Sequence, residues 1–329
     1  MPTVSVLMPT YNYGEFLARA IESVLEQDFT DLELVISDNA SDDDSETIAC
    51  RYAAQDSRVK YFRNASNVGL IGNFNLCYRR SNPESTFFIG LPADDWWDAR
   101  LLEQLVSAAR QYPEVTLLHC DAYRVEQDDT IINRYTDLFR YLPAAGPHQA
   151  LAELLRNNYI PYQGTLVCRE HAHSLYPIED FHAAALPRTS DYHLWLQLLC
   201  RGAKAYFLNE PLAYIRKHEK ASTMPSNIIP RLEQEVQTYQ ALRDVCPAEQ
   251  QDLLRDVTAG RHAKLAFQLL QNSQPAAARN HLRQARALYG RYRLDISVAS
   301  AISVLPVPVT LRTRLWNVAR LAHRTLRTS

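Results

Sequence analysis

The chain has 329 residues, 47% of them hydrophobic, and a formal net charge of −2. It can therefore fill a sizeable core, which excludes disordered and fibrous proteins, and it has no overall attraction to nucleic acid, so we predict no nucleic-acid partner. Only 9 residues are glycine, where an average content of about 7% would give roughly 23. None of them forms Gly-x-Gly or Gly-Lys-Ser/Thr, which excludes the dinucleotide-binding fingerprint and the P-loop.

Short β-branched runs alternate with helical patterns from the N-terminus, which is typical of parallel βαβ units with helices on both faces of the sheet. The elements predicted there are strand 4–8, helix 16–25, strand 32–36, a helix from about residue 45, strand 59–62, helix 73–80, strand 86–91 and helix 101–108. The pattern then weakens, and it predicts strand 116–120, helix 150–155, strand 165–168, a helix with Ser190 as N-cap that stops at Gly202, and strands 205–208 and 212–215.

The C-terminal third is predicted to be helical. Residues 264–270 and 276–288 form a predicted helical hairpin, separated by a polar segment that ends in Pro275. Beyond residue 311 the sequence is basic, with five arginines and no acid. We therefore predict an α/β domain over residues 1–224, and a helical region with a basic amphipathic tail over residues 225–329.

The cysteine pattern and the tail predict the location of the chain. Six cysteines are scattered without a Cys-x-x-Cys pair, and no apolar run reaches the ~18 residues of a transmembrane helix. We therefore expect a cytoplasmic chain with reduced thiols. In the tail, arginines alternate with apolar residues, which favours either a helix on the inner face of the cytoplasmic membrane or one packed on its own domain or a partner subunit. A homo-oligomer is therefore left open.

Polar residues follow the predicted strands, at the edge where parallel sheets bind ligands. Tyr11 can stack on a nucleobase, and Asp38 can accept a hydrogen bond from a ring N–H such as that of uracil. Asp94 and Asp95 offer hard oxygen ligands for Mg²⁺ or Mn²⁺, and such a cation would neutralise a diphosphate leaving group. A lone Asp or Asn after a strand is more often a turn residue, but several at one edge favour a binding site.

Five motifs in their order and spacing resemble glycosyltransferase family 2. They are Pro9-Thr10-Tyr11-Asn12, Ser23-Val24-Leu25-Glu26-Gln27, Ser37-Asp38-Asn39-Ala40-Ser41-Asp42, Asn67-Val68-Gly69 and Ala93-Asp94-Asp95-Trp96. The resemblance covers roughly residues 3–220. It implies the GT-A fold, an α/β class with a mostly parallel central sheet and helices on both faces, and inverting transfer of one sugar from a nucleotide-sugar donor with a divalent cation, Mn²⁺ or Mg²⁺.

The resemblance also implies roles for particular residues. The implied donor contacts are Pro9, Thr10, Tyr11, Asn12, Asp38, Asn67, Asp94 and Arg216, and the implied cation ligands are Asp94, Asp95 and His218. Many members read Asp-x-Asp-Asp, whereas this chain has Pro92 at the first position. The ribose contact that the first carboxylate of the motif makes in the family therefore has no equivalent side chain at this position. Which of Asp94 and Asp95 is the main cation ligand stays open.

A base for the acceptor hydroxyl is also needed, and the resemblance points to Asp191, at the start of a predicted helix. An acid in a first helical turn is favourable by ~0.3–1 kcal/mol without any function, and Asp180 is a rival base. Arg216 and His218 fall where the family closes over the donor phosphates, although a solvated basic turn would also explain them.

Two other functions compete with glycosyl transfer. A nucleotidyltransferase would also use paired carboxylates, but it would normally need a cation-rich loop after the first strand, and that loop has no cation here. A nucleotide-sugar-binding scaffold without activity is the second alternative. The chain has no Gln-x-x-Arg-Trp motif of processive synthases, so we predict an enzyme that adds one sugar to a glycan or lipid-linked acceptor in cell-surface polysaccharide biosynthesis.

Overall fold

The computed structural model describes residues 2–139, 142–176, 189–218 and 228–289. The chain divides into two compact units, Met1–Glu219 and Lys220–Ser329. The predicted domain border, the rival base Asp180 and the basic tail all lie outside the described residues.

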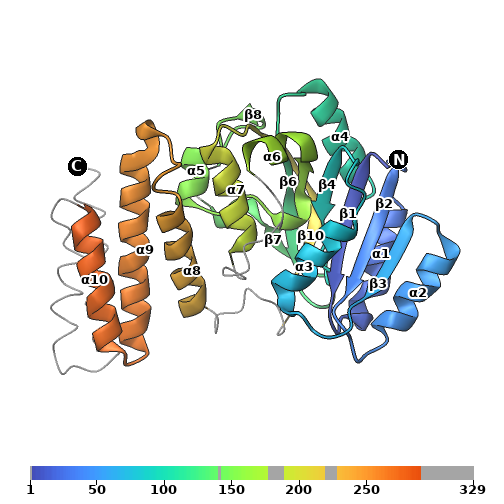
Figure 1. The fold of residues 1–329 in the computed structure, drawn as a ribbon, viewed down its shortest axis with the longest axis horizontal. Helices are drawn as coiled ribbons and strands as arrows, with labels where there is room; N and C mark the ends of the chain where they lie inside the picture. Colours follow the sequence, from blue (N-terminus) through green and yellow to red (C-terminus); the bar gives the residue numbers. More distant parts are fainter. Residues whose placement is uncertain (1, 140–141, 177–188, 219–227, 290–329) are drawn as a thin grey trace. The chain divides into compact units, whose positions relative to one another are not determined.

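The first unit is built on one large sheet (Figure 1). Its strands are β1 (Val4–Thr10), β2 (Leu32–Asp38), β3 (Val59–Arg63), β4 (Phe87–Gly90), β5 (Trp96–Trp97), β6 (Leu117–Val125), β7 (Ile131–Arg134), β8 (Gly146–His148), β9 (Thr165–Cys168) and β10 (Ala205–Arg216). Its helices are α1 (Gly14–Leu25), α2 (Ser45–Gln55), α3 (Gly69–Arg80), α4 (Leu101–Gln111), α5 (Leu151–Arg156), α6 (Arg169–Leu175) and α7 (Ser190–Cys200), with 3-10 turns η1 (Thr136–Leu138) and η2 (Tyr162–Gly164).

The strand order is β3-β2-β1-β4-β9-β6-β10-β5, with β7 beside β6 and β8 beside β10. Strands β3, β2, β1 and β4 are parallel, and so are β6 and β10. Strand β9 is antiparallel to both of its neighbours, β4 and β6, and therefore joins these two parallel parts. The carboxyl ends of β1, β2, β3 and β4 consequently meet at one edge, where the predicted site residues lie.

Helices cover both faces of the sheet because its strands are apolar on both sides. Val6 of β1 belongs to the same buried cluster as Leu17 and Ile21 of α1. Phe88 of β4 points to the opposite face, since side chains alternate along a strand, and its ring lies 5.1 Å from that of Tyr78 in α3. This arrangement confirms the predicted α/β class with a mostly parallel sheet.

Several local predictions were wrong. The two strands predicted at 205–208 and 212–215 are one strand, β10, whose register shifts on each side of Pro211 because proline cannot donate to the ladder. The N-cap of α7 is Thr189, and Ser190 is the first helical residue. Strands β5, β7 and β8 and helix α6 were not predicted, because two to seven residues hold too little periodicity to detect.

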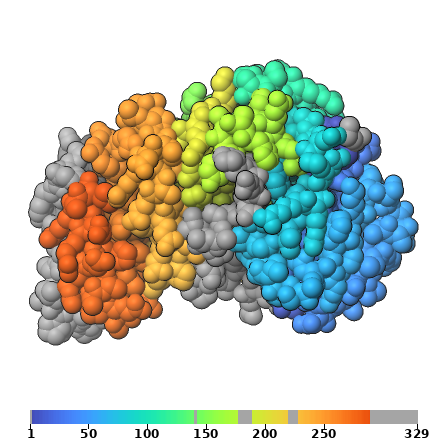
Figure 2. Space-filling view, viewed as in Figure 1, coloured from blue at the N-terminus to red at the C-terminus, as the bar shows by residue number. Residues whose placement is uncertain are grey.

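The second unit is helical, as predicted, with α8 (Ile228–Ala241), the 3-10 turn η4 (Ala248–Gln250), α9 (Gln251–Gln271) and α10 (Pro275–Tyr289). Its core holds Leu232, Leu265, Leu269 and Leu282, and α9 and α10 present the orange and red surface in Figure 2. The predicted hairpin exists, although α9 begins well before residue 264. None of the helices in the described segments has the length and apolar character to cross a membrane.

Candidate active site

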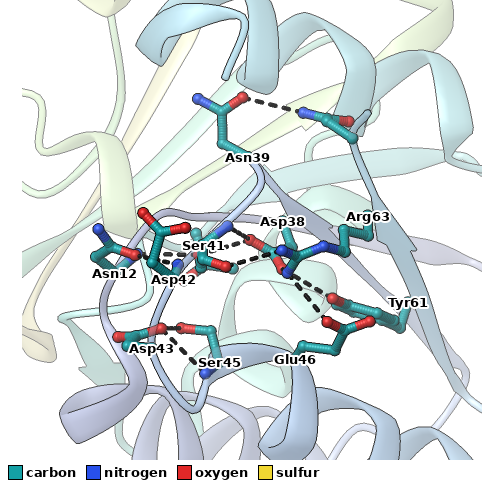
Figure 3. A network of polar contacts seen from close by, with 12 residues as sticks. Asn12, Asp38, Asn39, Ser41, Asp42, Asp43, Ser45, Glu46, Tyr61 and Arg63 are labelled. Atoms are coloured by element: carbon teal, nitrogen blue, oxygen red, sulfur yellow. Dashed lines mark hydrogen bonds and ion pairs between the residues drawn. The ribbon is translucent and has the colours of Figure 1, made fainter. Parts of the chain in front are cut away.

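The loops that follow β1 and β2 are joined by hydrogen bonds (Figure 3). The Asn12 backbone N donates to Ser41 Oγ at 3.0 Å, and the Asp42 backbone N donates to Asn12 Oδ1 at 2.8 Å. Asn12 has a φ of 57°, a left-handed conformation that asparagine tolerates better than most residues. These bonds fix the loop that carries Tyr11, whose residue surface is 41% exposed.

Asp38 ends β2 and is completely buried. Its Oδ1 accepts from the backbone N and Oγ of Ser41 at 2.9 and 2.6 Å. Its Oδ2 accepts from the Tyr61 hydroxyl at 2.8 Å and from Arg63 Nη1 at 2.9 Å. Both carboxylate oxygens therefore carry two donors, so a nucleobase N–H could bond Asp38 only by displacing or sharing one of them.

Asn67 belongs to a second polar network beyond β3. Its Oδ1 accepts from Asn39 Nδ2 and from the Gly69 backbone N, both at 2.8 Å. Gly69 has a φ of 79°, which glycine adopts without strain. At the end of β1, Thr10 Oγ1 is buried and has no hydrogen-bond partner among the described residues, so it is a polar atom that a ligand could satisfy.

Asp94 and Asp95 have different surroundings although they are adjacent. Asp95 is 3% exposed, its Oδ1 accepts from the Arg216 backbone N at 2.8 Å, and its Oδ2 accepts from Gln163 Nε2 at 2.6 Å. Burial, with the charge of Asp94, raises the pKa of Asp95 well above its usual range. The Asp94 side chain is 13% exposed, and its Oδ2 lies 2.8 Å from His218 Nε2. Of the two carboxylates, that of Asp94 is thus the accessible one.

Arg216 connects these two carboxylates to the rest of the site. Its Nε donates to the backbone carbonyl of Asp94 at 3.2 Å, and its Nη1 donates to Asp129 Oδ1 at 2.7 Å. The guanidinium carbon lies 4.8 Å from the Phe16 ring centroid and 4.6 Å from that of Trp96. The Arg216 side chain is only 5% exposed, so the interpretation as a solvated turn residue is wrong.

His218 and Asp94 fit a divalent cation. The His218 side chain is 4% exposed, and its ring centroid lies 5.7 Å from that of Tyr13 and 5.5 Å from that of Phe16. Burial, with the charges of Asp94 and Asp95, raises the pKa of the Tyr13 hydroxyl. No cluster of three or more His, Cys, Asp or Glu ligands occurs in the described segments. The pair would therefore supply two ligands and leave the others to diphosphate oxygens and water, as Mg²⁺ sites commonly do.

Asp191 lies in the first turn of α7 and is half-buried. Burial raises the pKa of Asp191, as expected for a carboxylate that has to accept a proton near neutral pH. The charge of Asp191 also contributes to the raised pKa of Tyr162 in η2, although burial is the main cause. The next residue in η2, Gln163, bonds Asp95, so this turn links the surroundings of Asp191 to the carboxylate pair.

The structure thus brings together Asp94, Asp95, Arg216 and His218, and it joins the loops of Asn12, Asp38 and Asn67. Sequence reasoning missed Gln163 and Asp129, because neither stands in a motif and each meets its partner across at least 68 residues. The Trp96 indole beside Asp95 is covered and not free to stack on a sugar ring, because Arg19 lies 3.7 Å from its ring centroid and Tyr214 stacks parallel to it at 4.9 Å.

Comparison with known proteins supports the resemblance. The profile of Glycosyl transferase family 2 matches residues 5–166. A Campylobacter jejuni GalNAc(5)-diNAcBac-PP-undecaprenol β-1,3-glucosyltransferase is 37% identical over 112 residues, which is 34% of each chain. The putative glycosyltransferase EpsE of Bacillus subtilis is 27% identical over 295 residues, 87% of this chain and 95% of that relative. The chain spans only about a third of the length of some curated relatives that it matches.

Solved structures show the same fold. S. aureus TarS 1-349 has a TM-score of 0.66 at 15% identity, and covers 98% of this chain and 92% of its own. The mannosyltransferase PcManGT of Pyrobaculum calidifontis, in complex with GDP-Man and Mn²⁺, has a TM-score of 0.59 at 20% identity, and covers 99% of this chain and 83% of its own. The family match identifies residues 5–166 as a glycosyltransferase family 2 domain, and the solved structures show that the chain has the GT-A fold.

Proposed function

We propose that the chain is an inverting glycosyltransferase that moves one sugar from a UDP-sugar to a hydroxyl of a glycan or lipid-linked acceptor in bacterial surface-polysaccharide synthesis. The observation that carries this proposal is the Asp94–His218 pair, at 2.8 Å, beside the carboxyl ends of the parallel strands of a family 2 domain. The donor class is supported by a TarS structure in complex with UDP-GlcNAc. The acceptor class is supported by the Campylobacter relative, whose name contains PP-undecaprenol, a lipid-linked diphosphate.

The donor nucleoside would bind over the ends of β1 and β2. Tyr11 is exposed there and can stack on the base, while the loop around Asn12 is held by Ser41. Asp38 would bond the base only after giving up a donor, and Arg63 is the one best placed to leave, since its side chain is 35% exposed. Thr10 Oγ1, which has no hydrogen-bond partner in the segments that the structure describes, would gain a ligand bond nearby.

Asp94 and His218 would hold Mn²⁺ or Mg²⁺ against the donor diphosphate. The bound cation would supply charge neutralisation for the leaving diphosphate. Asp95 would not bind it directly, because Asp95 is 3% exposed and each of its oxygens is turned to a donor inside the protein, Arg216 or Gln163. Asp95 would instead fix the backbone that carries Asp94 and the end of β10 that precedes His218.

Asp191 would act as the base. A carboxylate with a raised pKa holds a proton more strongly, so it draws the proton from the acceptor hydroxyl more effectively as the oxygen attacks the anomeric carbon. Attack on the face opposite the departing diphosphate inverts the anomeric configuration. No covalent sugar–enzyme intermediate is needed, so one base is sufficient.

The proposal is tested by a thermal-shift panel of UDP-, GDP- and dTDP-sugars on the full chain, each with Mn²⁺ and with EDTA. We expect UDP-sugars to raise the melting temperature only with Mn²⁺. The panel contradicts the proposal if no nucleotide sugar gives a cation-dependent shift.

We also propose that the chain works at the inner face of the cytoplasmic membrane, where lipid-linked acceptors are reached, with its basic sequence beyond residue 311 as the contact. Juxtamembrane arginines each add about 1 kcal/mol of attraction to anionic lipid. Deleting residues 312–329 should release the chain from liposomes that contain anionic lipid. Unchanged partitioning would rule out this role of the tail.

A further inference from the structure

The turn between β6 and β7 presents the carboxylate of Asp129 to Arg216, which in turn contacts the backbone of Asp94 in the candidate cation site. The turn is closed by hydrogen bonds from the Glu126 backbone N to the Thr130 carbonyl at 2.9 Å, and from the Asp129 backbone N to the Glu126 carbonyl at 3.1 Å. Asp129 has a φ of 71°, a left-handed conformation that Asp and Asn reach more readily than other non-glycine residues. Its side chain is 39% exposed, so it belongs to the surface of the turn and not to the core.

Asp129 bonds two cationic side chains from other elements. It pairs with Arg216 at the end of β10, at 2.7 Å, and with Arg19 of α1. Arg19 in turn lies flat on Trp96, 3.7 Å from the ring centroid. Burial alone would raise the pKa of Asp129, but the bonds from Arg19 and Arg216 hold it below the usual range. Asp129 is therefore ionised and held on both sides.

For Arg216, Asp129 is the counter-charge. The Arg216 side chain is 5% exposed, and Asp129 is the one carboxylate in the described part of the chain with which it forms an ion pair. The other bonds of its guanidinium go to uncharged carbonyl oxygens, those of Gln127 at 2.8 Å and Asp94 at 3.2 Å. A buried guanidinium that loses its counter-ion is strongly unfavourable and turns to the next carboxylate within reach.

Two carboxylates stand near Arg216: that of Asp95, whose oxygens already accept from the Arg216 backbone N and from Gln163, and that of Asp94, whose backbone carbonyl Arg216 contacts. We propose that Asp129 is a positioning residue that holds the Arg216 guanidinium away from the Asp94 carboxylate, and so keeps this carboxylate open to a divalent cation. This inference rests on the proposed cation site at Asp94 and His218. Without Asp129, a guanidinium that pairs with Asp94 would compete with the cation for the same oxygens and add a like charge beside it.

The test is the substitution Asp129→Asn in the full chain. Asparagine keeps the left-handed backbone and the size of the side chain, so the turn is retained. Asp128→Asn is the matched control, because Asp128 lies in the same turn and its bonds within the described segments go to Thr130, whose backbone N lies 3.1 Å from Asp128 Oδ1. Binding of Mn²⁺ in the presence of UDP is measured by electron paramagnetic resonance of the free ion. We expect about tenfold weaker Mn²⁺ binding for Asp129→Asn, the lower end of what partners of metal ligands contribute, and a change within about twofold for the control.

A double variant separates competition from simple loss of structure. If the freed guanidinium occupies Asp94, then adding Arg216→Gln to Asp129→Asn should recover most of the lost Mn²⁺ affinity. If Asp129 only stabilises the fold, the double variant should bind Mn²⁺ no better than the single one, and this overturns the inference. Melting curves identify the folded variants, and Asp129→Gly, which also suits the turn, repeats the test with another side chain.

The outcomes also separate this inference from the proposed function. If the wild-type chain binds no Mn²⁺ with UDP, the proposed cation site is wrong. If the wild-type chain binds Mn²⁺ and Asp129→Asn binds it within twofold as tightly, the cation site stands and the role of Asp129 is refuted.

Discussion

Replacing Asp94 and Asp95 one at a time by asparagine should give opposite results, although the two residues are neighbours and the substitutions are nearly isosteric. In Asp95→Asn, the amide oxygen still accepts from the Arg216 backbone N, and the new NH₂ group faces Gln163, whose own amide can turn and accept. No hydrogen bond is lost, and one buried charge beside Asp94 disappears. Asp94→Asn instead removes the accessible charged ligand from the pair with His218.

The size of the Asp95 effect follows from its pKa. Because the pKa of Asp95 is raised in the folded state, its protonated form favours folding and its ionised form opposes it. The free energy of unfolding therefore falls as the pH rises toward the folded pKa. Each unit of the shift corresponds to about 1.4 kcal/mol, or ~3–6 °C in melting temperature for a domain of this size. In EDTA at pH 7.5, Asp95→Asn should therefore melt at a higher temperature than the wild type. The gain should vanish at low pH, where Asp95 is protonated in both states.

Cation binding supplies the other half of this test. Asp94→Asn should weaken Mn²⁺ binding at least about 100-fold, the upper end of what even partners of metal ligands cost. Asp95→Asn should retain most of the Mn²⁺ affinity. Melting curves in EDTA and Mn²⁺ titrations in the presence of UDP check both. The assignment of Asp94 as the cation ligand is refuted if Asp95→Asn loses its affinity for Mn²⁺ while Asp94→Asn retains it.

Four further predictions concern other residues. Asp191→Asn should lower the rate of transfer on the order of 10²–10⁴-fold without lowering stability at neutral pH. The kcat/KM of the wild type should fall as the pH drops through a pKa above the ordinary value of 3.8, and retained turnover of the variant would exclude Asp191 as the base. Asp38→Asn should weaken UDP binding, and it should also lower the melting temperature, because Tyr61 and Arg63 lose a charged acceptor; unchanged calorimetric affinity would count against a nucleobase role. Gly90→Ala should destabilise the fold by about 1–3 kcal/mol in urea unfolding, since a Cβ there would lie 1.9 Å from the Tyr162 hydroxyl oxygen; wild-type stability would show that Tyr162 moves freely. Burial lowers the pKa of His119 well below the ordinary 6.5, so the free energy of unfolding of the wild type should decrease as the pH falls below about 6.5. His119→Met should reduce this decrease between pH 7.5 and 5, and the same dependence of unfolding free energy on pH in both proteins would contradict the reasoning.

The strands and helices of the first half were predictable because each has a local signal. Strands β1 and β2 are mostly apolar segments of seven residues, buried at every position, and α1 has its apolar residues on one face. Strand β5 has only two residues and exists because Trp96 and Trp97 pair with β10, a contact with no local signal. Strand β10 was divided in two because Pro211 interrupts its apolar pattern, whereas pairing with β6 on both sides of the proline holds it together.

The candidate site was predictable where the residues stand in motifs. Asp94, Asp95 and His218 were found in this way, and the structure adds the difference between the two carboxylates, which depends on Gln163 and Arg216. Arg216 was predicted from the resemblance to contact the donor phosphates. In the structure its guanidinium is buried and bonded to Asp129, a residue 87 positions away. Such pairs are fixed by the tertiary fold, so no local pattern in the sequence reveals them.

Cation-dependent transfer at Asp94 and His218 is tested by incubating the full chain with UDP-sugars and identifying the nucleotide that is released. Transfer of the sugar from a UDP-sugar leaves UDP, so we predict release of UDP that requires Mn²⁺ or Mg²⁺, stops in EDTA, and is lost in Asp94→Asn and His218→Ala. Formation of UTP and a sugar 1-phosphate from the UDP-sugar, on addition of pyrophosphate, would instead indicate a nucleotidyltransferase. UDP release that is unaffected by EDTA or by loss of Asp94 and His218 would contradict the cation site on which the account depends.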